Sequence, residues 1–309
     1  MITFTHEQKL DIAAALMAAY EKSSFVGSMP KFATSVDLLP ADMTAIKNAT
    51  WYGRNKPTII GDAKWLKIAR IAGYQKNPDA AWHIADTSVK RFCFAQMQAC
   101  QTMSMTAMLV DDAGIGKTAA CKAYAADYEN VFYIDCSIVS NKAAFIRELG
   151  KITGAGADGK LNEVLDTAIY ALSQMERPLL ILDEAGDIEH TTLLCIKRIY
   201  NSLEGLCGMY AVGSDGLKTK IKRGVAANKL GFTEFFSRFG KKFSVCLTGN
   251  YEDKISKLQA MARDIAEANG VTDAADLNKI VTAITKDGTV GDMRRVKLEV
   301  QKLKLRKSA

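Results

Sequence analysis

The 309-residue sequence has few of the features that mark membrane, secreted or fibrous proteins. No apolar run approaches the roughly 18–20 residues that a membrane-spanning helix needs. The first residues also lack the basic and apolar segments of a signal peptide. Only five prolines are present and 48% of the residues are hydrophobic, which excludes a fibrous, disordered or low-complexity chain. We therefore expect a globular, cytoplasmic protein of about two domains.

Histidine and paired cysteines are scarce as well. The chain has three histidines and an odd number of cysteines, seven, with no Cys-x-x-Cys pair among them. Neither a disulfide framework nor a zinc site is therefore predicted. Several cysteines stand in apolar surroundings, and we interpret them as small buried hydrophobic residues, with a reactive role as the alternative.

Positive charge is concentrated in two segments. The net charge is +7, yet residues 216–242 alone hold eight lysines and arginines against one acidic residue, and residues 281–309 hold eight against three. The rest of the chain is net negative. A nearly neutral body with two basic segments favours an anionic polymer as partner, although solvated surface lysines would give the same composition.

The first 76 residues predict a small all-helical unit. Thr5 and Gln8 match a capping box before an apolar helix face. Residues 31–47 read as two short helices joined by a tight turn, which resembles the helix-turn-helix core of phage-repressor-type domains. An ordinary helical bundle used for oligomer contacts is the alternative. If the unit reads DNA, the residues expected to contact a groove are Asp42, Thr44 and Lys47.

The middle of the chain alternates between short apolar runs and helical patterns. Five strands are predicted, at residues 106–110, 131–134, 179–182, 209–212 and 243–247. Strands separated by helices indicate a parallel, three-layer α/β sheet. We expect a helical unit over 1–76, a linker over 77–88 around Asn77-Pro78-Asp79, an α/β core over 89–252 and a helical segment over 253–309.

A phosphate-binding loop is predicted at residues 111–118, Asp-Asp-Ala-Gly-Ile-Gly-Lys-Thr, between a strand and a helix. Its small residues let backbone N–H groups wrap phosphates, and the helix N-terminus adds positive potential. Lys117 would contact the β- and γ-phosphates, and the Thr118 hydroxyl would ligate Mg²⁺. The expected nucleotide-binding residues are Ala113, Gly114, Ile115, Gly116, Lys117, Thr118 and Ala119.

Asp111 stands where such loops usually begin with glycine. An extra carboxylate beside phosphates is unfavourable unless it points away or pairs with a cation. Asp111 therefore departs from the usual motif.

The predicted strand 179–182 ends in two carboxylates, Asp183 and Glu184. Ligands of open α/β sheets bind at this carboxyl edge. We expect Asp183 to hold the water shell of Mg²⁺ and Glu184 to orient and deprotonate the attacking water. An acidic turn without function is the alternative. The adjacent Asp-Glu pair indicates an ATPase, and no Asn-Lys-x-Asp element that would read guanine is present.

Three further polar residues complete the predicted site. Ser214, after the strand 209–212, fits a sensor of the γ-phosphate, with Thr248 and Asn250 as rivals. Arg238, among aromatic residues, is predicted to be an arginine finger for a neighbouring subunit. Its alternative is an isolated arginine on a basic surface. Arg294 resembles the second sensor of such ATPases, and a plain helix start is the alternative.

In this order the motifs resemble the AAA+ ATPases over about residues 88–309. A closer resemblance is to the target-selecting B proteins of Mu-like transposable phages. It rests on Thr87-Ser88-Val89-Lys90, on Asp183-Glu184-Ala185, and on Phe236-Ser237-Arg238 followed by Lys241-Lys242. Asp111 and Ser214 depart from the usual pattern, which affects the expected rate of hydrolysis more than nucleotide binding.

This resemblance implies a protein that uses ATP and Mg²⁺ and polymerises on double-stranded DNA as an oligomer or helical filament. It further implies that the protein captures target DNA with little sequence preference and stimulates a transposase in the cytoplasm of a bacterial host cell. The segment 216–229 is expected to project as a loop whose cations contact DNA phosphates. These cations are Lys218, Lys220, Lys222, Arg223 and Lys229. A helicase-loader or replication-initiator ATPase, and a signalling or scaffold NTPase, remain open as alternatives.

Overall fold

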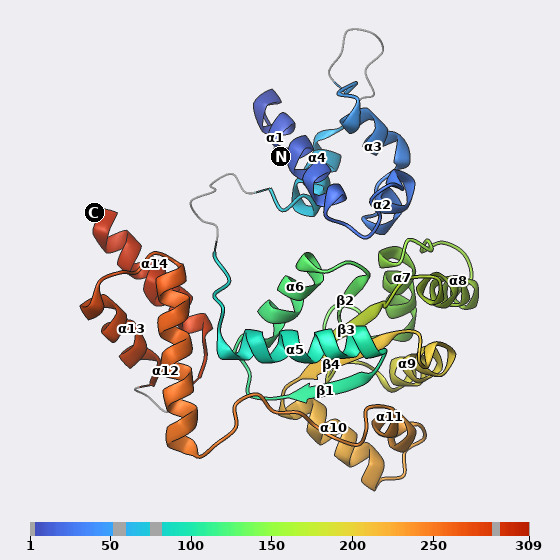
Figure 1. Ribbon diagram of the computed structural model, residues 1–309. Coiled ribbons are helices and arrows are strands. Elements are labelled where there is room, and N and C mark those ends of the chain that lie inside the picture. Colours follow the sequence, from blue (N-terminus) through green and yellow to red (C-terminus); the bar gives the residue numbers. More distant parts are fainter. Residues whose placement is uncertain (1–3, 52–59, 75–81, 286–290, 309) are drawn as a thin grey trace. The chain divides into compact units, whose positions relative to one another are not determined.

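The computed structural model describes residues 4–51, 60–74, 82–285 and 291–308 (Figure 1). The chain divides into two compact units, each described here by itself. One comprises Met1–Ala81 with Ala143–Met175, and the other Trp82–Lys142 with Glu176–Ala309. Asn77, Pro78 and Asp79, which mark the predicted linker, lie outside the described residues.

The N-terminal part is all-helical, as expected. Its helices are α1 (His6–Glu21), α2 (Met29–Ser35), α3 (Pro40–Lys47) and α4 (Asp62–Ile71). The predicted capping box begins α1, because Thr5 Oγ1 accepts a hydrogen bond from Gln8 N and Gln8 Oε1 accepts one from Thr5 N. The four helices share a buried apolar core that includes Leu16, Met43 and Trp65.

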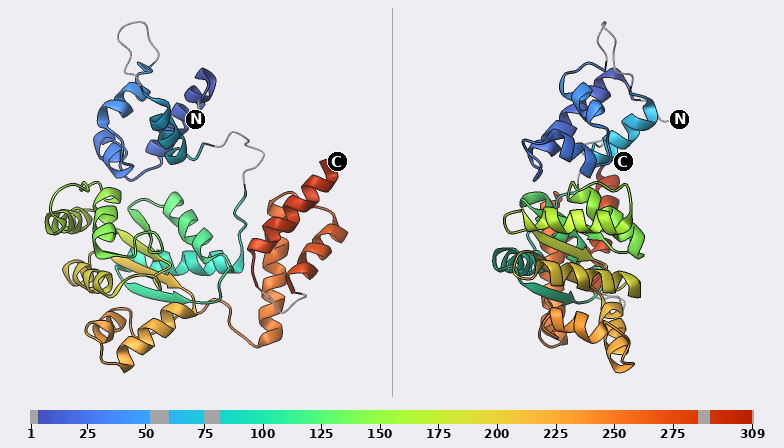
Figure 2. Two further views of the ribbon diagram at one scale, coloured as in Figure 1. Left: turned by 180° about the vertical axis from the view of Figure 1, so that it is seen from behind. Right: turned by 90° about the vertical axis from the view of Figure 1, so that its right-hand side faces the viewer.

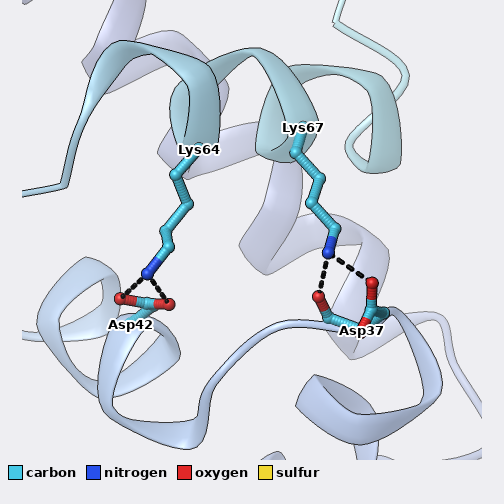
Figure 3. A network of polar contacts seen from close by, with 4 residues as sticks. All are labelled: Asp37, Asp42, Lys64 and Lys67. Carbon is cyan, nitrogen blue, oxygen red and sulfur yellow. Dashed lines mark hydrogen bonds and ion pairs between the residues drawn. The ribbon is translucent and has the colours of Figure 1, made fainter.

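Two lysines of α4 pair with aspartates, one in the connection between α2 and α3 and one in the first turn of α3 (Figure 3). Lys67 contacts both the carboxylate and the carbonyl of Asp37, and Lys64 Nζ lies 2.9 Å from Asp42 Oδ2. The Lys67 hydrogen bond lowers the pKa of Asp37 below its ordinary value. Asp42 is buried and paired within this unit, which corrects the expectation that its side chain faces a DNA groove.

The second unit contains a four-stranded parallel sheet among the residues that the structure describes. The strands are β1 (Thr106–Val110), β2 (Val131–Asp135), β3 (Leu179–Asp183) and β4 (Gly208–Gly213), in the spatial order β1-β4-β3-β2. Every residue of the central strands β3 and β4 is buried, as expected for strands covered on both faces. All four agree with the predicted strands to within one residue at each end.

In chain order, the first of the remaining helices precedes β1, and the others connect or follow the strands (Figure 2). These helices are α5 (Ser88–Met103), α6 (Lys117–Asp127), α7 (Lys142–Ile152), α8 (Leu161–Ser173), α9 (His190–Leu203), α10 (Asp215–Ala226), α11 (Phe232–Arg238), α12 (Tyr251–Ala268), α13 (Ala274–Thr285) and α14 (Arg294–Ser308). Helices α12–α14 form the predicted C-terminal helical part and contribute Met261, Ile280 and Val296 to the apolar core of this unit. Helix α8, and α7 after its first residue, belong to the segment Ala143–Met175 of the first unit. No helix within the described ranges is long and apolar enough to cross a membrane.

The prediction of a fifth strand over 243–247 is wrong. A single bridge joins Leu109 to Ser244, with Ser244 N donating to Met108 O at 2.8 Å and Val110 N donating to Ser244 O at 3.0 Å. The N–H groups of Cys246 and Leu247 donate to the carboxylate of Asp111 instead of to a strand backbone. Regular pairing therefore stops after one bridge.

The prediction of a loop over 216–229 is also wrong, because α10 occupies most of it. Leu217, Ile221 and Gly224 are buried at spacings of four and three residues, which is the period of a helix with one buried face. The basic residues of this segment therefore lie on a rigid helix rather than on an extended loop.

Candidate nucleotide-binding site

A cavity of about 690 Å³ lies at the carboxyl edge of the sheet. This volume falls in the range of small-molecule sites. It brings together the predicted residues from the loop after β1, the end of β3, the end of β4 and the start of α14. These are Ala113, Gly114, Ile115, Gly116, Lys117, Thr118, Ala119, Asp183, Glu184, Ser214 and Arg294. Arg238, Thr248 and Asn250 do not line it.

The loop after β1 adopts left-handed backbone at Gly114, with φ of 78°, and at Gly116, with φ of 101°. A Cβ on Gly114 would lie 2.4 Å from Asp292 Oδ1, so no larger residue fits there without movement. Met293 N donates to Gly114 O at 2.9 Å. The segment that leads into α14 is therefore packed directly on the loop, and Arg294 follows it into the cavity.

Helix α6 begins at Lys117, directly after this loop. Unpaired N–H groups at a helix N-terminus attract phosphate. Lys117 is buried, and its Nζ donates to the carbonyl oxygens of Asp111 at 2.8 Å and Asp112 at 2.6 Å. The ammonium group is thus held inside the curve of the loop, where Thr118 also lines the cavity.

Asp111 faces away from the cavity. Its Oδ2 accepts hydrogen bonds from Cys246 N at 2.7 Å and Leu247 N at 2.9 Å, and its Oδ1 accepts one from Asp112 N at 2.8 Å. Burial opposes its ionised form, but the hydrogen bonds from Cys246, Leu247 and Asp112 lower the pKa of Asp111 below its ordinary value. The carboxylate that seemed unfavourable beside phosphates is therefore bound to the segment after Ser244.

Asp183 is buried at the end of β3 and is fixed by two hydrogen bonds. Tyr133 Oη donates to Asp183 Oδ2 at 2.8 Å, and Glu184 N donates to Asp183 Oδ1 at 3.0 Å. Burial raises the pKa of Tyr133, so the phenol remains a donor. Tyr133 was not predicted as a site residue, and its only signal was a polar tip between the apolar residues Phe132 and Ile134 of β2.

Glu184 has a left-handed backbone, with φ of 47°. For a non-glycine residue such a conformation is unfavourable and concentrates at functional sites. Burial, followed by the charge of Asp183, raises the pKa of Glu184 above that of an ordinary carboxyl. A carboxylate with a raised pKa at the edge of a cavity is suited to accept a proton.

Ser214 lies at the end of β4, the strand between β1 and β3. It therefore stands next to both the phosphate-binding loop and Asp183. Neither rival lines the cavity. The backbone carbonyl of Thr248 accepts from Lys257 Nζ at 2.7 Å, and the Asn250 side chain forms a capping box with Asp253 at the start of α12.

Arg238 ends α11, outside the cavity. Its Nε donates to Asn201 Oδ1 at 3.1 Å, and its guanidinium lies 5.5 Å from the centre of the Tyr200 ring. Phe235 and Phe239, its aromatic neighbours in the sequence, are buried, and the side-chain contacts of Arg238 come from α9 instead.

The five predicted DNA-binding residues divide into two groups. Lys222, Arg223 and Lys229 are exposed and Lys218 is half-buried. Lys220 turns inward, since its Nζ donates to the carbonyls of Gly186, at 2.9 Å, and Ile188. Burial lowers the pKa of Lys220, although the charge of Asp187 opposes this.

The cavity is also lined by apolar residues that were not predicted, namely Trp82, Ile84, Ala85, Ile265 and Met293. These apolar side chains suit a planar base. Thr118 and Asp183 offer a hydroxyl and a carboxylate, which are donors that Mg²⁺ accepts. The residues present thus fit a nucleoside triphosphate with Mg²⁺.

Among the residues that the structure describes, no group of three or more histidine, cysteine, aspartate or glutamate side chains is arranged to hold a metal ion. Six of the seven cysteines are buried, all seven are free thiols, and Cys246 is half-buried.

Comparisons with known proteins agree with this geometry. The model of the AAA domain family matches residues 105–220. The chain is 24% identical, over 204 residues, to the Mu-like prophage FluMu DNA transposition protein B of Haemophilus influenzae, and the match covers 66% of this chain and 67% of that protein. It also resembles the structure of the Aeropyrum pernix Orc1 protein in complex with DNA, with a TM-score of 0.51 and 16% identity. That match covers 74% of this chain but 62% of the Orc1 chain, and it supports the α/β fold.

Proposed function

We propose that this AAA+ protein, which resembles transposition protein B of a Mu-like prophage, is an ATP-dependent DNA-binding ATPase that assembles on DNA, selects target DNA and activates a transposase. The observation that carries the proposal is the single cavity shared by Lys117, Asp183 and Glu184. The name of the relative supports the role in transposition. The proposed place of action is the cytoplasm of a bacterial host cell, which contains the DNA of that cell.

Binding of ATP uses the loop after β1 and the start of α6. The backbone N–H groups there surround the phosphates, and Lys117 exchanges its two carbonyl partners for phosphate oxygens. Thr118 and Asp183 would hold Mg²⁺, which neutralises charge on the β- and γ-phosphates when bound. The apolar residues around Trp82 and Ile265 would take up the adenine.

Hydrolysis relies on Glu184, Ser214 and Arg294. Glu184 would orient the attacking water and accept its proton, while Tyr133 keeps the Asp183 carboxylate in place. Ser214 would contact the γ-phosphate from the end of β4. Arg294 would place positive charge over the phosphates from the start of α14.

Assembly follows from the position of Arg238. Its guanidinium is held by Tyr200 and Asn201 on α9, outside the cavity of its own subunit. We infer that it completes the site of a neighbouring subunit, where an arginine contributes roughly 10³–10⁵ in rate. ATP would then favour an oligomer or filament, and its hydrolysis would loosen the interface.

The proposed DNA surface consists of Lys218, Lys222, Arg223 and Lys229. Contacts of these side chains to phosphates give affinity that depends on salt and reads little sequence. Repetition of α10 in every subunit of an oligomer would place many such contacts along one duplex, so weak individual contacts would add up to tight binding.

The experiment is co-sedimentation of the purified protein with random-sequence duplex DNA, with and without a non-hydrolysable ATP analogue and Mg²⁺. We expect DNA binding that requires the analogue and fails for Lys117→Ala. Binding that is equal with and without nucleotide would contradict the proposal. Stimulation of a Mu-type transposase in the same mixture separates this function from that of a helicase loader or replication initiator.

A further inference from the structure

Lys220 differs from the other basic residues of α10. Its ammonium group is half-buried and bonded to two backbone carbonyls, those of Gly186 and Ile188. Lys222 and Arg223, on the same helix, are exposed. Lys220 therefore links α10 to another segment of the chain.

The segment that Lys220 binds is the one that carries the proposed catalytic base. Gly186 and Ile188 follow Glu184 by two and four residues. A Cβ on Gly186 would lie 3.2 Å from the backbone nitrogen of Leu217, so this segment also packs against the first turn of α10. Ala185 N donates to Val212 O of β4 at 2.8 Å, which fixes its other side.

The first turn of α10 has its own link to the site. Leu217 N donates to Ser214 O at 2.9 Å, and Ser214 lines the cavity. Helix α10 is therefore linked to the cavity at its beginning, through Ser214. It is linked to the segment after Glu184 through Lys220. Its exposed basic side chains face solvent.

We propose that Lys220 is a positioning residue that transmits DNA binding on α10 to Glu184, so that bound DNA raises the rate of ATP hydrolysis. This rests on the proposed function and adds a form of regulation to it. The left-handed backbone of Glu184 is unfavourable and depends on its surroundings. When phosphates immobilise α10, the two bonds of Lys220 hold the segment 184–188 more firmly, which favours the geometry that catalysis needs.

The test compares Lys220→Met with Lys222→Met. Methionine keeps an unbranched apolar chain but donates no hydrogen bond, and Lys222 is the exposed neighbour on the same helix. ATP turnover is measured without DNA and with saturating random duplex DNA, alongside ATP and DNA affinity. We expect the DNA-to-no-DNA turnover ratio of Lys220→Met to fall to nearly one, while its ATP and DNA affinities stay within about twofold of wild type.

Lys222→Met should instead weaken DNA binding and, once DNA is saturating, retain the wild-type turnover ratio. Lys220→Arg, which keeps the charge and its donors, should restore most of the ratio. Two results overturn the role of Lys220. One is a DNA-to-no-DNA turnover ratio in Lys220→Met equal to that of the wild-type protein, and the other is a ratio of one in the wild-type protein itself. Wild-type protein that binds no DNA at all overturns the proposed function instead.

A measurement on the wild type covers the case in which Lys220→Met does not fold. Hydrogen–deuterium exchange of the segment 184–189 is followed with and without duplex DNA, at constant ATP analogue. The proposal predicts slower exchange in this segment when DNA is bound. Unchanged exchange there, with slower exchange in α10, contradicts it.

Discussion

The carboxylate of Asp111 accepts hydrogen bonds from the backbone N–H of Cys246, at 2.7 Å, and from its thiol, although the two residues are 135 positions apart. This contact joins the first residue of the phosphate-binding loop to the segment between Arg238 and α12. The segment thus links the phosphate-binding loop to Arg238, the proposed arginine finger, and to the C-terminal helices.

Replacement of Asp111 with asparagine should destabilise the protein. An amide has a single acceptor oxygen, so either the N–H of Asp112, or the N–H groups of Cys246 and Leu247 together, lose their acceptor. An unsatisfied buried donor costs about 1–3 kcal/mol. Denaturant unfolding measures the loss, and stability equal to wild type would contradict this role of Asp111.

The same contact predicts a pH dependence. The pKa of Asp111 is lower in the folded state than its ordinary value of 3.8. Its contribution to stability is therefore fully present above the unfolded pKa and is lost as the pH falls through the folded pKa. The stability gap between wild type and Asp111→Asn should shrink as the pH is lowered below about 4. A gap that widens on acidification contradicts the assignment.

Glu184→Gln should bind ATP normally and hydrolyse it about 10²–10⁴-fold more slowly, because glutamine cannot accept the proton of the attacking water. The protein should therefore remain assembled on DNA after ATP is added. In the wild type, turnover should fall as the pH drops through the pKa of Glu184, which is raised above 4.5. Turnover of Glu184→Gln like that of wild type would assign the base to another residue.

Tyr133→Phe removes the hydrogen bond to Asp183 Oδ2 and should raise the Mg²⁺ concentration needed for half-maximal ATPase activity severalfold. Tyr210→Phe is the control, because it also removes a tyrosine hydroxyl that donates one hydrogen bond, to Gln96 at 2.8 Å, outside the cavity lining. Both variants should lose about 1 kcal/mol of stability. Only Tyr133→Phe should change the Mg²⁺ requirement, and equal behaviour of the two would contradict a role in holding Asp183.

Combined replacement of Lys218, Lys222 and Arg223 with alanine should weaken DNA binding and reduce the slope of log affinity against log salt by up to about three. Sequence preference should not change, because these contacts reach phosphates. Titrations at several salt concentrations measure the slope. An unchanged slope would move the DNA surface to another part of the molecule.

The sequence predicted the four strands well because apolar runs buried on both faces leave a strong signal, as in Leu179–Asp183. The fifth strand was predicted from an apolar run too, yet Asp111 takes the N–H groups that pairing would need. The segment 216–229 was expected to be a loop because it lies between two predicted strands, although the spacing of the buried residues Leu217 and Ile221 is that of a helix.

The residues of the candidate site were predicted better than their partners. Loop and strand-end motifs are local in sequence, and the structure gathers Lys117, Asp183, Ser214 and Arg294 around one cavity. Their roles stay predictions. The contacts of Asp111 with Cys246 and of Lys220 with Gly186 join distant positions, so no local pattern could have indicated them.

The most direct test of the account is the assembly state of the purified protein in analytical ultracentrifugation with a non-hydrolysable ATP analogue, Mg²⁺ and duplex DNA. The account predicts that the wild-type protein forms large assemblies when the ATP analogue, Mg²⁺ and DNA are all present. It predicts that the Lys117→Ala and Arg238→Ala variants form no such assemblies under the same conditions. A wild-type protein that remains monomeric under these conditions would contradict the central claim that ATP joins neighbouring subunits on DNA.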